Sequence, residues 1–260
     1  MKKFFFVLMT AFALVSCSES FNAARLLQGG AKAAQAASIS NEQMQEYIAQ
    51  SVAQLDAQAT VLPASNPYSQ RLARITKGLT AVNGTPLNFK VYKTDEINAF
   101  ACADGSVRVY TGLMDLMSDN EVLGVIGHEI GHVALEHTLK AYKNALLTSA
   151  MLDAVASTGD VAAVLSDSVL GQLGASMVSA KFSRKQETAA DDFSYDFMKG
   201  AGMNPMYLAT AFEKLLGESE GGSATASKVA EMFSSHPDTK ARIERVTSKA
   251  AADGYSRPAK

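Results

Sequence analysis

Cysteine is scarce in this chain, and neither sign of charge is in clear excess. Only two of the 260 residues are cysteine, Cys17 and Cys102, so a framework of several disulfides is excluded. The formal net charge is −2 with no strong basic or acidic block, which gives no support for nucleic-acid binding. Apolar residues make up 47% of the chain, enough for the core of one domain of ordinary size.

A convincing membrane span is also missing. Residues 146–178 come closest, being apolar and rich in Ala and Ser, but three acidic residues interrupt them: Asp153, Asp160 and Asp167. Isolated acidic side chains are costly in lipid, which argues against a membrane hairpin. We instead expect two helices that pack on the domain or form a lid over its cleft, ending near residue 180.

The N-terminus predicts a lipoprotein signal. Two lysines precede the apolar run from Phe4 to Val15, which is too short to cross a bilayer as a helix of the folded protein. The tetrapeptide L-V-S-C at residues 14–17 resembles a bacterial lipobox. We therefore expect cleavage after residues 1–16 and acylation of Cys17. An ordinary signal peptide cut near Ser16, with Cys17 uninvolved, is the alternative.

Acyl chains on Cys17 would tether an otherwise soluble domain to a membrane surface. Ser18, rather than Asp, follows this cysteine, as in lipoproteins sent on to the outer membrane. We expect residues 17–40 to be the lipid-anchored tether and residues 41–260 to be one domain facing the periplasm. Cys102 would then have no disulfide partner and would be most stable as a small buried residue.

Helical periodicity dominates the domain, with one short region of alternating residues. We expect helices from about residue 41 to 55 and from Asn66-Pro67 to Asn83-Gly84. Residues 87–92, 97–101 and 107–110 alternate as strands, with a tight turn before the last of them. The pattern predicts a mainly α chain with a small antiparallel β-sheet, an α+β fold.

The strand over residues 97–101 has a predicted role in binding. The small sheet leads straight into Gly112-Leu113-Met114 and the helix of the main motif, so one of its strands is a candidate for the edge of the cleft. An edge strand there can bind an extended peptide by main-chain hydrogen bonds, with Asn98 and Ala99 as the contact residues. Ordinary sheet residues without a binding role are the alternative.

One pentapeptide carries most of the chemistry. Residues 128–132 read H-E-x-x-H, and on a helix two histidines four residues apart point the same way. His128 and His132 thus supply two nitrogen ligands to one Zn²⁺, and Glu129 can take a proton from an activated water. Histidines that merely pack or face solvent are the alternative. The surrounding helix is apolar nearly all round, and a buried Glu129 without a partner would be costly.

The same helix carries a stripe of small residues. It is expected to begin near Ser118 and to continue to about Tyr142. Gly124, Gly127 and Gly131 share one side of it, which would let another backbone approach beside the histidines.

The third ligand has to come from outside the pentapeptide. A metzincin continuation needs glycine at 135 and histidine at 138, where this chain has Leu135 and Thr138. His137 is one residue early, and on a continuous helix it points to the opposite side. That completion is excluded.

A later helix offers a glutamate instead. Glu187 would complete a His₂Glu site, and Asp191, four residues on and on the same face, would accept the free N–H of a ligand histidine. A solvated, charged helix start is the alternative for this segment.

Three motifs together resemble a known family. G-H-E-I-G-H, S-R-K-Q-E-T-A-A-D and S-S-H-P-D-T-K-A-R-I are similar to motifs of the zinc metallopeptidases that include HtpX, the CAAX prenyl proteases and the mitochondrial Oma peptidase. The LoiP-type subgroup of bacterial lipoproteins is the most similar, and the resemblance extends from about residue 38 onward. It implies a zincin-like (gluzincin-type) domain with one Zn²⁺ per chain, and proteolysis in or beside membranes, often in quality control.

The resemblance also implies a catalytic role for His236, which by sequence alone is a structural histidine in a surface turn. In the family, a histidine before proline lies near the zinc. It either stabilises the developing oxyanion or occupies the open coordination position in a resting form. Asp238 is expected to cap the following helix, and Arg242 to brace the loop.

The sequence therefore predicts a zinc endopeptidase on the periplasmic face of the outer membrane that cleaves misfolded or unassembled envelope proteins. Its expected partners are protein and peptide substrates, the membrane through the lipid anchor, and other envelope proteases or outer-membrane assembly factors. Two rivals stay open. One is a chaperone-like binding or assembly factor that rarely cuts, and the other is a structural zinc whose four positions are all filled.

Overall fold

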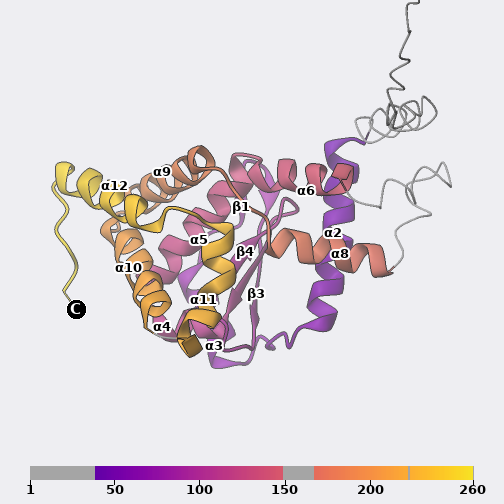
Figure 1. Cartoon of the computed structure of the whole chain (residues 1–260), viewed down its shortest axis with the longest axis horizontal. Coiled ribbons are helices and arrows are strands. Elements are labelled where there is room, and N and C mark those ends of the chain that lie inside the picture. Colours follow the sequence, from indigo (N-terminus) through magenta and orange to yellow (C-terminus); the bar gives the residue numbers. More distant parts are fainter. Residues whose placement is uncertain (1–38, 149–166, 222, 260) are drawn as a thin grey trace, which may run out of the picture.

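The computed structural model describes residues 39–148, 167–221 and 223–259 (Figure 1). The expected signal peptide, Cys17 and nearly all of the expected tether lie outside the described residues. The elements in chain order are α2 (Asn41–Gln58), α3 (Pro67–Ile75), β1 (Ala81–Val82), β2 (Thr85–Pro86), β3 (Asn88–Tyr92), β4 (Ala99–Ala101), β5 (Ser106–Tyr110), α4 (Thr111–Leu116), α5 (Asp119–Ala134), α6 (His137–Thr148), α8 (Asp167–Val178), α9 (Arg184–Gly200), α10 (Met206–Glu220), α11 (Ser223–Ser235) and α12 (Thr239–Ala252).

Helix α5 runs through the middle of the molecule (Figure 1). Strand β4 packs on it, and α9 and α10 also pack on it, with α12 against α10. Helices α2, α6 and α8 form a second group, on the far side of the sheet from α10 and α12 in Figure 1. Every residue of α5 from Glu121 to Val133 is buried, which confirms the prediction of a helix enclosed on all sides. The motif helix is therefore the core of the fold.

Two apolar clusters correspond to this arrangement. The larger joins residues of the sheet to α5, α9, α10, α11 and α12, and the smaller joins α2, α6 and α8 to the other face of the sheet. Cys102 is buried in the smaller cluster and carries a free thiol, as expected. Burial raises the pKa of this thiol well above its ordinary value, so it stays protonated and unreactive.

The sheet differs from the prediction in one respect. Strands β4 and β5 form the expected antiparallel hairpin, with Ala99 opposite Val109. Strand β3, however, pairs with β5 in parallel, so the three-stranded sheet has the order β3-β5-β4 and is mixed rather than antiparallel. All five residues of β5 are buried, which suits a central position. Strand β4 lies at an edge, as expected. The prediction of a mainly helical α+β fold is confirmed.

Two predicted helices end earlier than expected. Helix α3 begins at Asn66-Pro67 as expected, with the Asn66 side chain accepting the Tyr68 N–H, but it stops at Ile75. Residues 81–86 instead form the β1–β2 hairpin, in which Asn83 and Gly84 both have positive φ. The sequence predicted that Asn83-Gly84 ends the helix, but this pair forms the turn of a hairpin. The motif helix also stops early, at Ala134, and Glu136 adopts a left-handed conformation before α6 begins.

The glycine stripe does bring another helix close. Ideal Cβ atoms at Gly127 and Gly131 would lie 2.8 Å from Ser194 Oγ and 3.1 Å from the Ala190 carbonyl oxygen, both on α9. Ser194 Oγ also donates a 2.7 Å hydrogen bond to the Gly124 carbonyl. Larger side chains on this face of α5 would push α9 away. The stripe therefore sets the distance between the histidines and the residues that α9 carries.

The expected lid is described only in part. Residues 149–166 lie outside the described residues, and α8 packs against α2 and α6, with Gly174 close to Leu55. In the part of the chain that the structure covers, no helix combines the length and the apolar character needed to cross a bilayer.

Candidate metal centre

Three helices place four side chains around one point. The capping box of Ser118 and Glu121 fixes the start of α5, which carries His128 and His132 on one face. Helix α9 begins at a second capping box, and Glu187 stands in its first turn. His236 follows the end of α11. The predicted metal ligands are thus brought together, although Glu187 is far from the two histidines in sequence.

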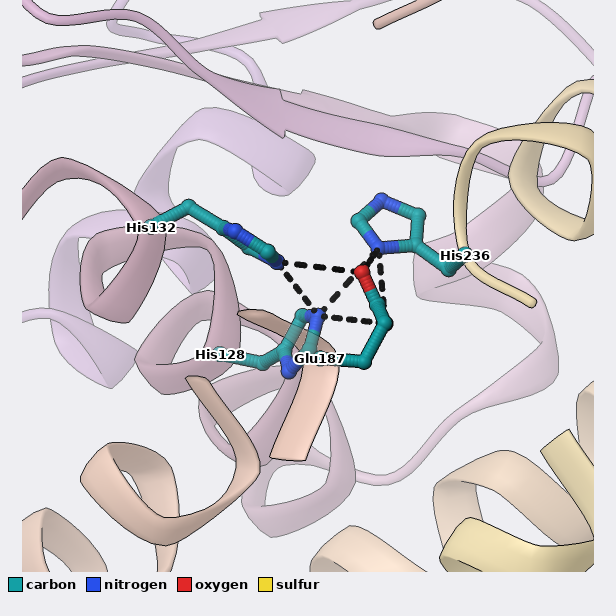
Figure 2. A group of neighbouring side chains, drawn as sticks. All are labelled: His128, His132, Glu187 and His236. Carbon is teal, nitrogen blue, oxygen red and sulfur yellow. Dashed lines mark hydrogen bonds and ion pairs between the residues drawn. The ribbon is translucent and has the colours of Figure 1, made fainter. Parts of the chain in front are cut away.

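The donor atoms converge (Figure 2). The Nε2 atoms of His128 and His132 are 3.1 Å apart, and the Glu187 carboxylate oxygens lie 3.5 and 3.4 Å from them, respectively. His236 Nδ1 is 3.1 Å from Glu187 Oε1 and 3.3 Å from His128 Nε2. One donor atom from each residue lies within 4.8 Å of the other three, and all four residues are buried. Such a set of nitrogens and carboxylate oxygen suits a metal ion.

Asp191 takes the position expected of it. Its Oδ1 is 2.9 Å from His128 Nδ1, so it accepts that N–H and leaves Nε2 free to face the other donors. The Asp191 side chain is fully buried. Burial opposes its ionisation, but the charge of Arg242 and a hydrogen bond from His128 outweigh this and lower the pKa of Asp191 to about 2.

Arg242 has a larger role than the sequence indicated. Its guanidinium contacts Glu187 Oε2 at 2.6 Å through Nη1 and holds both Asp191 oxygens, through Nη2 at 2.7 Å and Nε at 3.0 Å. It also lies 4.2 Å from the centre of the Phe212 ring. Rather than bracing a loop, Arg242 neutralises two buried carboxylates. The arginine was visible in the H-P-D-T-K-A-R run, but its partners were not.

The expected cap by Asp238 is wrong. Asp238 does stand at the N-cap position of α12, but its φ is +64° and its side chain makes no capping hydrogen bond. It forms an ion pair with Arg184 instead.

The carboxyl group of Glu129 is buried beside this set. Its Oε1 has no hydrogen-bond partner among the described residues, and His236 Nε2 is 3.6 Å away. Burial raises the pKa of Glu129 above its ordinary value, the direction that suits a carboxyl group which takes up and returns a proton. Burial likewise disfavours the charged form of Glu187, but hydrogen bonds from His132 and His236 outweigh it and keep its pKa low. The two glutamates are thus suited to different tasks.

A narrow apolar pocket opens next to Glu129. It lies among α5, α10, α11 and α12, and its apolar walls are Val125, Phe212, Leu215, Met232 and Phe233. His128, Glu129, His236 and Arg242 form its polar end. A side chain that entered this pocket would be desolvated within reach of the reactive groups.

Two aromatic rings border His132, and the sequence indicated neither. Phe182 stacks on the His132 ring, with centroids 3.8 Å apart, and His137 Nδ1 lies 3.0 Å from His132 Nδ1. His137 reaches this position only because the chain turns at Glu136, where no glycine or proline marks a break. A continuous helix would have pointed it away.

Asn98 and Ala99 lie at the sheet edge as predicted, and both are buried. The Asn98 carbonyl accepts the Tyr110 N–H across the hairpin, so the main-chain groups of Ala99 point outward. The Asn98 side chain already accepts the outward N–H of Ala99 at 2.9 Å. Helix α11 lies next to this edge, because the Ile97 N–H bonds to the Lys228 carbonyl. Substrate binding by Asn98 and Ala99 stays a prediction.

Comparison with known proteins agrees with this geometry. The model of peptidase family M48 matches residues 68–250. Metalloprotease LoiP of Escherichia coli K12 is 42% identical over 95% of this chain and 96% of its own length, and metalloprotease YcaL of the same strain is 40% identical over 87% of each chain. The β-barrel assembly-enhancing protease of Escherichia coli O157:H7 is 31% identical over 64% of this chain and 35% of its own length. The chain therefore belongs to peptidase family M48 and is a metalloprotease of the zincin-like class.

Proposed function

We propose that the metal is Zn²⁺, one ion per chain, held by His128, His132 and Glu187. The spacing of the donors is the observation that carries this proposal. Zinc bonds of about 2.0–2.1 Å in a tetrahedron place neighbouring donors about 3.3–3.4 Å apart. Five of the six pairs among these residues and His236 have donor atoms 3.1 to 3.5 Å apart when either Glu187 oxygen is counted, and one donor atom of each residue lies within 4.8 Å of the other three. Ca²⁺ and Mg²⁺ prefer more oxygen ligands than this site offers.

Bound Zn²⁺ would lower the pKa of a coordinated water towards about 7 and polarise a carbonyl group. Glu129 takes the proton of the attacking water, because its carboxyl group is buried and has an unpartnered oxygen. It then returns that proton to the leaving amine. Asp191 holds His128 in the tautomer whose Nε2 faces the site, and Arg242 keeps the charge of Glu187 in place.

Both roles proposed for His236 fit its position. Its Nδ1 stands among the ligand atoms, where it fills a fourth corner of the set, and its Nε2 faces Glu129. Glu129 and Glu187 raise the pKa of His236 against the effect of burial, so a ring that has moved away from the ligand atoms can carry the proton that it donates to an oxyanion. We propose that the ring occupies the fourth position at rest and donates to substrate during turnover.

We further propose that the substrates are misfolded or unassembled envelope proteins. The apolar pocket beside Glu129 suits side chains that folded proteins bury, and unfolded segments expose such side chains. One relative is a β-barrel assembly-enhancing protease by name, which supports work alongside outer-membrane assembly factors. The lipobox-like segment and Ser18 support an anchor in the outer membrane, facing the periplasm.

A chaperone-like factor that binds and rarely cuts is the second candidate. The observation in its favour is that four side chains already surround the site. His236 therefore occupies the position that a substrate would need. A structural zinc with His236 as its fourth ligand would give the same picture.

Removal of the metal separates these candidates. We expect purified protein to cleave casein, a chelator to reduce the rate at least about 100-fold, and one equivalent of Zn²⁺ per chain to restore it, because the bound ion supplies the nucleophile. Mg²⁺ at the same concentration should not restore it. Binding of casein without cleavage by the zinc-loaded protein would instead support the chaperone-like reading.

The anchor is tested by Cys17→Ser. Without its thiol, the precursor cannot be acylated, so we expect loss of palmitate labelling and a shift from the outer-membrane fraction to the soluble periplasmic or precursor pool. Cys102→Ala is the matched control, because that buried thiol is not an acylation site, and it should label normally. Unchanged labelling of the Cys17→Ser variant would contradict the proposal.

A further inference from the structure

The contact between His132 and His137 has a defined direction. His132 Nε2 faces His128 Nε2 at 3.1 Å and Glu187 Oε1 at 3.4 Å, so a metal at the centre of the set would need the lone pair of that nitrogen. A neutral imidazole then carries its proton on the other nitrogen, Nδ1. This Nδ1–H must donate to the atom 3.0 Å away, His137 Nδ1. His137 is accordingly the acceptor and carries its own proton on Nε2.

The surroundings hold this pair in place. His132 is fully buried and His137 is 9% exposed, so water competes little for the bond. Phe182 stacks on the face of His132, and its main-chain N–H donates to the Ser235 carbonyl beside His236. The stacked ring limits tilting of His132, while the bond to His137 limits its rotation. The ring of His132 is therefore restrained by two contacts that the HExxH motif does not contain.

We propose that His137 is a positioning residue for the metal centre: it accepts the Nδ1–H of His132 and so fixes the tautomer and ring angle of that ligand. The inference rests on the proposed metal site. His137 does for His132 what Asp191 does for His128, namely accept the Nδ1–H of the ring. The acceptor here is a neutral nitrogen instead of a carboxylate oxygen. The two histidine ligands thus have unlike partners, and the neutral one adds no negative charge to a site that already holds Glu129, Glu187 and Asp191.

The test compares three substitutions at His137. In His137→Asn the side-chain amide oxygen stands near the position of Nδ1 and can accept the same bond. In His137→Gln the amide lies one atom farther out, and His137→Leu has no acceptor. Thr138→Ala is the matched control, because the Thr138 hydroxyl is buried on the same turn and has no hydrogen-bond partner among the described residues.

The readout is Zn²⁺ affinity, measured by competition with a fluorescent chelator, beside the melting temperature of the metal-free protein. We expect His137→Leu and His137→Gln to bind Zn²⁺ about 10- to 100-fold more weakly, as is typical for loss of an outer-sphere partner. His137→Asn and Thr138→Ala should stay within about threefold of the wild type. Rescue by asparagine alone is a result that general damage to the helix would not produce.

The outcomes are distinguishable. Equal Zn²⁺ affinities of the glutamine and asparagine variants, or wild-type affinity of the leucine variant, would overturn the role of His137. If the leucine variant does not fold, the asparagine–glutamine comparison decides alone. Failure of the wild type itself to bind Zn²⁺ would instead refute the proposed zinc site, and with it the premise of a role for His137.

Discussion

Glu129→Gln is expected to bind Zn²⁺ like the wild type and to lose about 10²- to 10⁴-fold in kcat/KM for casein or a reporter peptide. Loss of a general base has an effect of this size. The amide has nearly the shape of the carboxyl group but cannot take a proton. Metal affinity should persist because Glu129 is not in the group of converging ligand atoms. Zinc content per chain and cleavage rate, measured on the same preparation, check both halves of the prediction.

The fold should tolerate this substitution. Glu129 Oε1 is buried without a partner among the described residues, and its raised pKa shows that ionisation is disfavoured there. A neutral amide therefore costs little stability. Glu244→Gln, at an exposed position on α12, is the matched control and should retain full activity. Full activity of the Glu129→Gln variant would exclude Glu129 as the base, whereas loss of zinc would assign it a ligand role instead.

Arg242→Met should have the largest effect on stability. Its guanidinium contacts Glu187 at 2.6 Å and Asp191 at 2.7 Å, all three side chains are buried, and the next cation, Arg245, is 3.8 Å from Asp191. Removal of one partner from a buried ion pair leaves charges uncompensated, which typically lowers the free energy of unfolding by about 3–5 kcal/mol. Chemical denaturation of the metal-free protein measures the change. Arg184→Met is the control, because the Arg184–Asp238 pair is exposed and should contribute about 1 kcal/mol or less.

The pH dependence gives this prediction a second test. The pKa of Asp191 is lowered to about 2, and that of Glu187 is also lowered, so their ionised forms stabilise the wild type above about pH 4. This contribution is lost as the pH falls towards about 2. Without Arg242 much of the lowering for Asp191 disappears, whereas that of Glu187, which His132 and His236 cause, persists. The stability gap between wild type and Arg242→Met should therefore narrow from pH 7 to pH 3 through Asp191. A gap that stays constant with pH would mean that Arg242 acts by packing, for example on Phe212.

Much of the site was predictable from local patterns. Two histidines four residues apart face the same way on any helix, and the stripe of glycines predicted that another backbone packs closely against it. The acidic residues after Ser118 indicated where that helix begins, and the structure confirms the start. Glu187 and Asp191 followed from the need for a third ligand and from their own spacing of four. The structure brings these side chains together because the inferences depend on helix geometry, which acts over a few residues, and their roles as ligands stay predictions.

Other features depended on contacts between distant segments. The parallel pairing of β3 with β5 cannot be inferred from alternation, since a strand has the same period in either orientation. The end of α3 at Ile75 was missed because apolar spacing continued through a hairpin. The partners of Arg242 lie on another helix, more than 50 residues away in sequence.

The sequence by itself determined that His128 and His132 share one face of a helix with Glu129 beside them, because their spacing lies within one element. Only the tertiary structure decided that His236 and Arg242 meet Glu187, and that a turn at Glu136 brings His137 back to His132. The meeting of His236 and Arg242 with Glu187 rests on the packing of α9 and α10 on α5 and of α11 and α12 on α10. No local pattern encodes these contacts, because the free energy of burying charges and rings depends on which partners the whole fold places beside them.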